Sequence, residues 1–173
     1  MYIEITFFAL LSTLLLFGFI ILGVGRFGLL GSYSAYSSKW GKAVPMNNMN
    51  LWTMVTLVAA FALCPALLEI GAASALQFLG FLTPVYLIVV SLTPDWQTNR
   101  TQYIIHMVFA ALCFAGGLAW MLLVMRGFGI LCGVAAFVLA LALLSGTQRS
   151  SAVFWTEMLM FASVYLAVLL AVL

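Results

Sequence analysis

The feature that most limits what this chain can fold into is a series of six apolar runs, each close to the length of a bilayer-spanning helix. They cover residues 3–24, 51–70, 74–92, 102–125, 127–144 and 152–173. Only 6% of the residues are charged, whereas a soluble domain carries about 25%. We therefore expect an all-α fold: a polytopic transmembrane bundle of six helices that forms a single domain over residues 1–173.

Several residues mark where these helices begin, bend and pack. Asn50 precedes the second run and suits an N-cap. Pro65 and Pro84 lie inside the second and third runs, where proline removes a backbone donor and bends a helix. Gly129 and Gly133 have the spacing of a close-packing pattern, although such matches arise easily by chance among 14 glycines. The three cysteines all lie in apolar runs without metal-ligand spacing, which predicts neither disulfides nor a metal site.

The loop charges predict an orientation. Six spans place both termini on one side of the membrane, and the other side receives the 25–50, 93–101 and 145–151 connections. These connections carry one acid, Asp95, and five basic residues: Arg26, Lys39, Lys42, Arg100 and Arg149. The positive-inside rule makes that side cytoplasmic and leaves both termini outside. The net charge of +2 is too small and scattered for a nucleic-acid partner.

The 25–50 connection is long for so small a protein and allows two interpretations. It is rich in serine, tyrosine and lysine. The more frequent case is an interfacial segment, anchored at the membrane surface by Tyr33, Tyr36, Trp40 and the lysines. The alternative is a lid or binding loop over one end of the bundle, to which Ser34 would contribute a hydroxyl.

The best candidate site rests on two ionisable residues at matched depth. His106, the only histidine, lies four residues into the fourth run, and Glu157 lies five residues into the sixth. Both runs enter from the same side, so at about 1.5 Å per residue each residue lies roughly 6–8 Å below the same surface. We expect the two side chains to meet, because a carboxylate beside an imidazole lowers the cost of burying both. Asp95 belongs to the same end.

Other interpretations stay open. A hydrogen-bonded clasp between helices, without a ligand, would place His106 and Glu157 in the same way. Glu69, with Gln77 and Arg126, could form a second, weaker cluster at the opposite end, or these groups could simply face lipid headgroups.

The chemistry of these residues leaves enzymatic activity undecided. Asp95, His106 and Glu157 could supply three metal ligands, but no HExxH signature accompanies them. Ser34 could complete a Ser–His–acid triad, but no nucleophile elbow is present. Proton-coupled transport would need an intramembrane acid and a repeated architecture, and no inverted repeat is visible. Haem normally needs paired histidines, and a retinal Schiff base needs a lysine within a span; neither is present.

Short motifs along the chain carry a resemblance. Ser-Ala-Tyr before a Lys-Trp loop, CPALLE, QFLGFL, IHMVFAALC and FWTEM together resemble small uncharacterised six-span membrane proteins of gut bacteria. The layout is distantly similar to that of ceramidase and progestin-receptor-like membrane hydrolases. That superfamily holds zinc with several histidines, and this chain has only His106. The resemblance implies a bacterial inner (cytoplasmic) membrane protein.

Together these observations predict an integral membrane protein with a polar pocket at its cytoplasmic end. The residues expected to line it are His106, Glu157, Asp95, Ser34, Tyr33 and Tyr36; Glu69 is the lesser candidate site residue and belongs to the cluster at the opposite end. The pocket would bind a lipid or small amphiphile, or the chain would serve a larger membrane complex as an accessory subunit. Membrane lipids are the expected partners, and no cofactor or metal is predicted. The alternative function is a metal-dependent membrane hydrolase acting on a lipid or amide.

Overall fold

The computed structural model describes residues 2–44, 50–71, 77–93, 97–145 and 151–172, which form seven α-helices and no strand. The helices are α1 (Tyr2–Phe27), α2 (Tyr36–Ala43), α3 (Leu51–Ile70), α4 (Phe78–Ser91), α5 (Arg100–Val124), α6 (Arg126–Ser145) and α7 (Ala152–Val172). All but the short α2 fall on the apolar runs of the sequence, so the expectation of an all-α fold is confirmed for the described residues.

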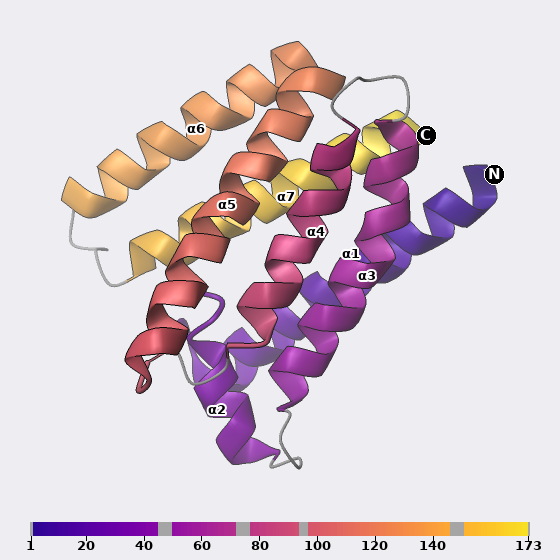
Figure 1. Cartoon of the computed structure of the whole chain (residues 1–173). Coiled ribbons are helices and arrows are strands. Elements are labelled where there is room, and N and C mark those ends of the chain that lie inside the picture. The colour runs from indigo at the N-terminus through magenta and orange to yellow at the C-terminus, as the bar shows by residue number, and fades with distance from the viewer. Residues whose placement is uncertain (1, 45–49, 72–76, 94–96, 146–150, 173) are drawn as a thin grey trace.

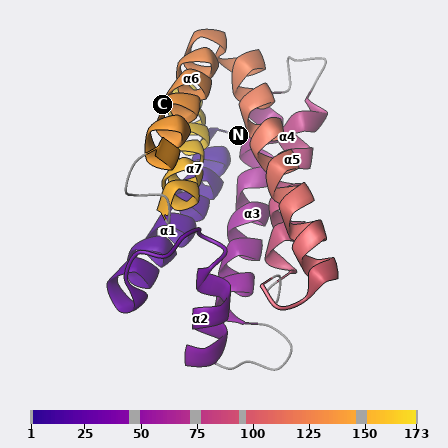
Figure 2. The ribbon, with the colours of Figure 1, turned by 90° about the vertical axis from the view of Figure 1, so that its left-hand side faces the viewer.

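The six long helices alternate in direction and form two layers. In Figure 1, α3, α5 and α7 run one way, whereas α1, α4 and α6 run the other way, so the two described chain ends lie at the same end of the molecule. Figure 2 shows α3, α4 and α5 in one layer and α1, α6 and α7 in the other. The short α2 lies beside α3, at the end of the molecule away from the two described chain ends (Figures 1 and 2).

The outer surface is strongly apolar. Ile3 on α1 is 85% exposed, and Leu131 and Phe137 on α6 are 65% and 66% exposed. Four helices, α1, α3, α5 and α7, are long and apolar enough to cross a membrane. An apolar side chain facing outward costs nothing in lipid, whereas the same surface in water would drive association. The structure thus supports integration into a membrane.

The predicted third span is shorter in the structure than in the sequence. The apolar run covers residues 74–92, but α4 covers only Phe78–Ser91, and residues 74–76 lie outside the described part. Fourteen residues reach about 21 Å, against a hydrocarbon core of about 30 Å. Four of the six expected spans therefore have the length and composition to cross, and α4 does not have the length.

Close helix packing depends on glycine. At Gly80 of α4, an added Cβ would lie 2.8 Å from the Leu67 carbonyl oxygen of α3. At Gly116 of α5, it would lie 2.8 Å from Thr83 Oγ1 of α4. We call this line of contacts between α3, α4 and α5 the glycine seam. The Gly129–Gly133 pair packs in the same manner: their added Cβ atoms would meet the α5 backbone and the Leu118 side chain.

Local signals at two helix ends behave as their chemistry requires. The predicted N-cap at Asn50 is confirmed, because its side chain accepts a 2.8 Å hydrogen bond from the Thr53 amide. Helix α1 ends at Phe27, and the next residue, Gly28, has a φ of 74°, which lies in the left-handed region that glycine adopts freely. From there the chain turns back toward the helices, which fixes the start of the 28–35 segment.

The aromatic residues of the 25–50 connection are not interfacial anchors. Tyr33, Tyr36 and Trp40 are all buried inside the protein. The Trp40 ring stacks on Phe19 of α1 at 4.8 Å between centroids, and the Tyr36 ring packs against Gly23. The expectation of rings at the membrane surface was therefore wrong, because Tyr36 and Trp40 pack against α1 and Tyr33 packs against α3 and α7.

Candidate functional site

A cavity of about 690 Å³ opens between α5, α7 and the 31–35 segment. We call it the α5–α7 cavity. Its described lining residues are Gly31, Ser32, Ser34, Ala35, Gln97, Tyr103, His106, Met107, Ala110, Ala111, Phe114, Ala152, Val153, Thr156 and Glu157. Pockets for small ligands generally span about 300–1,000 Å³. This volume is thus appropriate for one small molecule.

Helical spacing places the α5 residues on one wall. Tyr103, His106, Ala110 and Phe114 follow one another at intervals of three or four, which keeps them on one face of α5. The polar members lie in the first two turns, and Phe114 lies deeper along the helix. The wall therefore changes from polar to apolar along its length.

Glu157 ties the 31–35 segment to α7. Its Oε2 accepts a 2.6 Å hydrogen bond from the Tyr33 backbone amide. One turn earlier, the Phe154 amide donates to the Gly31 carbonyl oxygen at 2.9 Å. The two bonds hold the segment against the first turns of α7, where it forms a wall of the cavity.

His106 is tied to the end of α4. Its Nδ1 lies 2.8 Å from Thr93 Oγ1, and that hydroxyl donates to the Val90 carbonyl oxygen at 2.7 Å. Assigning the single hydroxyl hydrogen of Thr93 to the Val90 carbonyl makes Nδ1 the donor to Thr93. A neutral imidazole in this tautomer has an acceptor at Nε2. The ring is buried, so its orientation is fixed by packing and by this bond.

The Tyr33 ring secures the same segment from behind. Its hydroxyl shares a 2.7 Å hydrogen bond with Thr56 Oγ1 of α3, and the ring packs against Trp52 and Phe161. Burial raises the pKa of the Tyr33 phenol above its ordinary value, and the bond to Thr56 partly offsets this rise. The neutral phenol is thus part of the folded structure at physiological pH.

Three of the sequence-predicted site residues line the cavity: His106, Glu157 and Ser34. Tyr33 contributes its backbone amide rather than its hydroxyl. Tyr36 lies elsewhere, since its hydroxyl donates to the Gly28 carbonyl oxygen at 2.8 Å and burial raises its pKa. Asp95 lies outside the described residues.

Glu69 lies at the far end of the molecule, in the last turn of α3. It is exposed, as is Arg126, and within the described part of the chain no ion pair joins the two. Gln77 instead donates to the Leu68 carbonyl oxygen at 3.0 Å. The proposed second cluster is not formed by these side chains.

The sequence interpretation missed several cavity residues. On α5 these are Tyr103, Met107, Ala110 and Phe114, and on α7 Thr156. The signal that could have found the α5 residues was the helical period running from His106, because one face carries all four. No comparable signal exists for the Tyr33 amide or for the Thr93 hydroxyl.

The hydrogen bonds do not follow a catalytic triad. In a triad the acid binds and orients the imidazole, but here Nδ1 binds Thr93 while the Glu157 carboxylate binds the Tyr33 amide. Among the described residues no group of three His, Cys, Asp or Glu side chains could hold a metal ion. The groups that the cavity does present are acceptors and hydroxyls beside an apolar wall.

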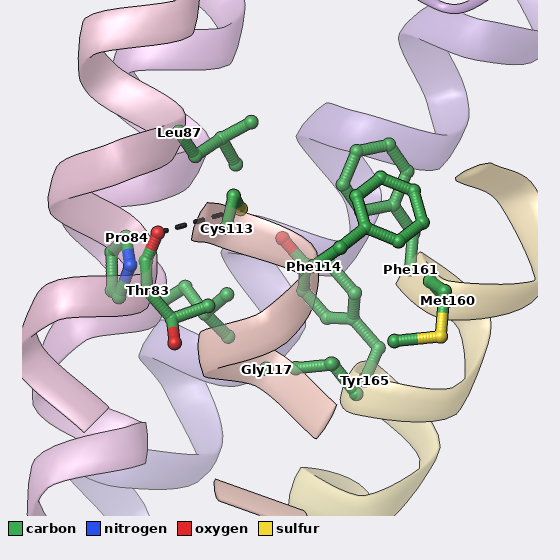
Figure 3. Close-up of a pocket in the computed structure, with 11 residues that line it drawn as sticks. Thr83, Pro84, Leu87, Cys113, Phe114, Gly117, Met160, Phe161 and Tyr165 are labelled. Atoms are coloured by element: carbon green, nitrogen blue, oxygen red, sulfur yellow. Dashed lines mark hydrogen bonds between the residues drawn. The ribbon is translucent and has the colours of Figure 1, made fainter. Parts of the chain in front are cut away.

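A second, smaller void of about 30 Å³ lies deeper in the bundle, between α3, α4, α5 and α7 (Figure 3). Its wall is apolar, and Phe114 lines both this void and the α5–α7 cavity. Figure 3 shows Cys113 next to it, donating to the Thr83 carbonyl oxygen at 3.5 Å. An apolar void of this size stays dry, so it extends the apolar part of the site rather than the polar part.

Comparison with known proteins found no family model, no curated protein and no solved structure that matches this chain.

Proposed function

We propose that this chain is an integral membrane protein that binds a lipid or another small amphiphile in the α5–α7 cavity. The observation that carries the proposal is the composition of that cavity. Glu157, His106 and the serine hydroxyls lie on its polar side, while Met107, Ala110 and Phe114 make its apolar wall. An amphiphile is the class of molecule that satisfies both kinds of wall at once.

The direction of the helices supports six membrane crossings. Helices α3, α5 and α7 run parallel, and each has the length and composition of a span. If two consecutive parallel helices both cross a bilayer, the helix between them has to return across it. This argument assigns crossings to α4 and α6, with α4 packed between α3 and α5 so that its short length is compensated by protein neighbours.

The basic residues support an orientation with the cavity at the cytoplasmic face. Arg26, Lys39, Lys42 and Arg100 all belong to the end that holds α2 and the first turn of α5. Cysteine accessibility tests this topology. A cysteine at Thr98 is expected to label only from the cytoplasm, and one at Gly127 only from outside. The opposite pattern would invert the orientation, and labelling of both from one side would refute six crossings.

Ligand binding can be tested by native mass spectrometry of the protein purified in mild detergent. Wild-type protein is expected to retain a lipid or amphiphile. Ala111→Trp, which places an indole in the cavity, is expected to lose it. The matched control is Ala115→Trp, because Ala115 is also exposed on α5 but does not line the cavity. Equal retention in both variants would refute binding in this cavity.

The hydrolase alternative requires a third ligand beside His106 and Glu157, and its candidate, Asp95, lies outside the described residues. Metal analysis of the purified protein separates the two functions. Stoichiometric zinc that is lost in His106→Ala would favour the hydrolase. Protein that retains an amphiphile and binds no zinc would favour the binding function.

A further inference from the structure

We propose that the amphiphile bound in the α5–α7 cavity carries a cationic amine as its head and that this amine binds the Glu157 carboxylate. This inference rests on the proposed function and specifies its ligand class. The ligand would be a single-chain amine, with its ammonium at Glu157 and its hydrocarbon chain along Met107 and Phe114.

The first argument is the charge of the cavity wall. Among its described lining residues the ionisable side chains are Glu157, His106 and Tyr103, and no lysine or arginine is included. A phosphate or sulfate head would place its negative charge beside the carboxylate with no described cationic side chain to offset it. A cationic head instead gains from the same carboxylate.

The second argument is the hydrogen-bonding capacity of Glu157. An ionised carboxylate has two oxygens and about four acceptor positions. The Tyr33 amide occupies one position on Oε2. A carboxylate at this depth in a membrane is costly unless it is paired or protonated, and one backbone amide does not neutralise its charge. An ammonium supplies both the missing positive charge and up to three N–H donors.

The other head groups supply fewer donors to the remaining acceptor positions of Glu157. An alcohol supplies one donor, and a carboxylate or phosphate diester supplies none.

The size and shape of the cavity agree with such a ligand. A cavity of about 690 Å³ suits one small ligand, and its apolar wall runs along one face of α5 from Met107 to Phe114. Beyond Phe114 lies the dry void of about 30 Å³. The site therefore fits one hydrocarbon chain with a compact head.

The experiment compares head groups on a constant chain. Dodecylamine, dodecanol and dodecyl phosphate compete with a fluorescent fatty amine for wild-type protein in lipid nanodiscs. We expect dodecylamine to bind at least ten times more tightly than dodecanol, and dodecyl phosphate to bind most weakly. Because this series uses unmodified protein, it does not depend on whether any variant folds.

Two variants of the same chemistry locate the interaction. Glu157→Gln removes the negative charge and is expected to reduce the dodecylamine preference at least tenfold. Glu69→Gln makes the same change at an exposed position of α3, away from the cavity, and is expected to leave the preference for dodecylamine unchanged. Equal losses in both variants would mean that the charge acts through the membrane surface and would overturn the assignment to Glu157.

The failure of this inference differs from the failure of the proposed function. If Ala111→Trp abolishes binding of all three probes but wild-type protein prefers the phosphate or shows no preference, the cavity binds amphiphiles and the amine assignment is wrong. If Ala111→Trp changes the binding of none of the probes, the cavity is not the binding site and both proposals fall. A preference for dodecylamine that is abolished by Ala111→Trp and lost in Glu157→Gln supports both.

Discussion

The glycine seam and the α5–α7 cavity use small residues to opposite effect. In the seam, Gly80 and Gly116 let α4 approach its neighbours so closely that a single added methyl would meet a backbone or hydroxyl oxygen at 2.8 Å. In the cavity, Ala110 and Ala111 face α7 across an open space of about 690 Å³. A small side chain gives close helix packing only where the backbone of the partner helix can approach it.

What holds the cavity open is the 31–35 segment. It lies against the first turns of α7, fixed by Glu157 and by the Phe154 amide. Tyr33 fills the space between this segment and α3. In the seam no such segment of the described chain lies between α3 and α4. These two helices are joined through a short connection and pack directly against each other. The difference indicates that small residues in membrane helices do not by themselves predict close packing or a cavity. The segments that connect the helices have to be considered with them.

The largest expected effect concerns the seam. Gly80→Ala places a methyl 2.8 Å from the Leu67 carbonyl oxygen, where backbone has to move. We expect a loss of about 1–3 kcal/mol in the free energy of unfolding in detergent. Gly18→Ala is the control, because nothing lies within 4 Å of its added methyl, and alanine is the better helix former. Equal stability of the two variants would show that the seam is not closely packed.

The second prediction concerns His106, which lines the cavity and bonds to the residue that follows α4. A double-mutant cycle of His106→Ala and Thr93→Val is expected to give a coupling energy of about 1 kcal/mol, the net value of a typical hydrogen bond. The His106→Ala and Glu157→Ala cycle is expected to give less, since each group bonds to a different partner. A larger coupling with Glu157 would restore the contact that the sequence predicted.

The third prediction is a pH dependence at Tyr33. Burial raises the pKa of the folded phenol above its ordinary value of 10.0, so the folded state binds a proton that the unfolded state releases at alkaline pH. This contribution to stability is complete below pH 10 and is lost as the pH rises above it. Tyr33→Phe is expected to cost about 1 kcal/mol near neutral pH by removing the bond to Thr56.

Above pH 10 the difference in the free energy of unfolding between wild type and Tyr33→Phe is expected to shrink, because only the wild-type protein is destabilised by keeping that phenol protonated. Unfolding curves of both proteins from pH 8 to 11 measure it. A gap that stays constant across this range would show that the Tyr33 hydroxyl titrates normally and is not buried behind the segment.

The smallest effect is expected on the cavity wall. Ala110→Leu adds three carbons at a half-buried residue that lines the cavity, and we expect stability within about 0.5 kcal/mol of wild type because the cavity offers room for them. The result sharpens the comparison with Gly80, where one carbon is not tolerated. A loss as large as that of Gly80→Ala would mean that the cavity closes in the membrane.

The sequence predicted the helices better than the contacts. Apolar runs mark helices in a membrane because the backbone has to form its own hydrogen bonds there. The constant rise per residue of a helix then predicted that His106 and Glu157 lie at the same depth, and both line one cavity. Their partners were not predictable in the same way. The Tyr33 amide has no signature in the sequence, since nearly every residue carries one, and Thr93 lies in a loop whose path depends on α4.

The aromatic residues of the 25–50 connection show a second limit. Tyrosine and tryptophan are equally at home at a membrane surface and in a protein interior, so composition alone did not distinguish the two. The burial of Tyr36 and Trp40 depends on α2 folding back against α1 and α3, and that of Tyr33 depends on contacts with α3 and α7. That path is a property of the tertiary structure and not of the segment.

The bond between Glu157 and the Tyr33 amide has a consequence for how this protein tolerates mutation. Because the acceptor binds the main chain, every residue at position 33 except proline supplies the same donor. A saturation scan at position 33 would thus divide into two classes, with proline detaching the segment and the others altering only what packs behind it. Position 157 has no such freedom, because the acceptor there belongs to the side chain, which has to be of the right length. As far as this bond alone is concerned, substitution is accordingly permitted at position 33 and restricted at position 157.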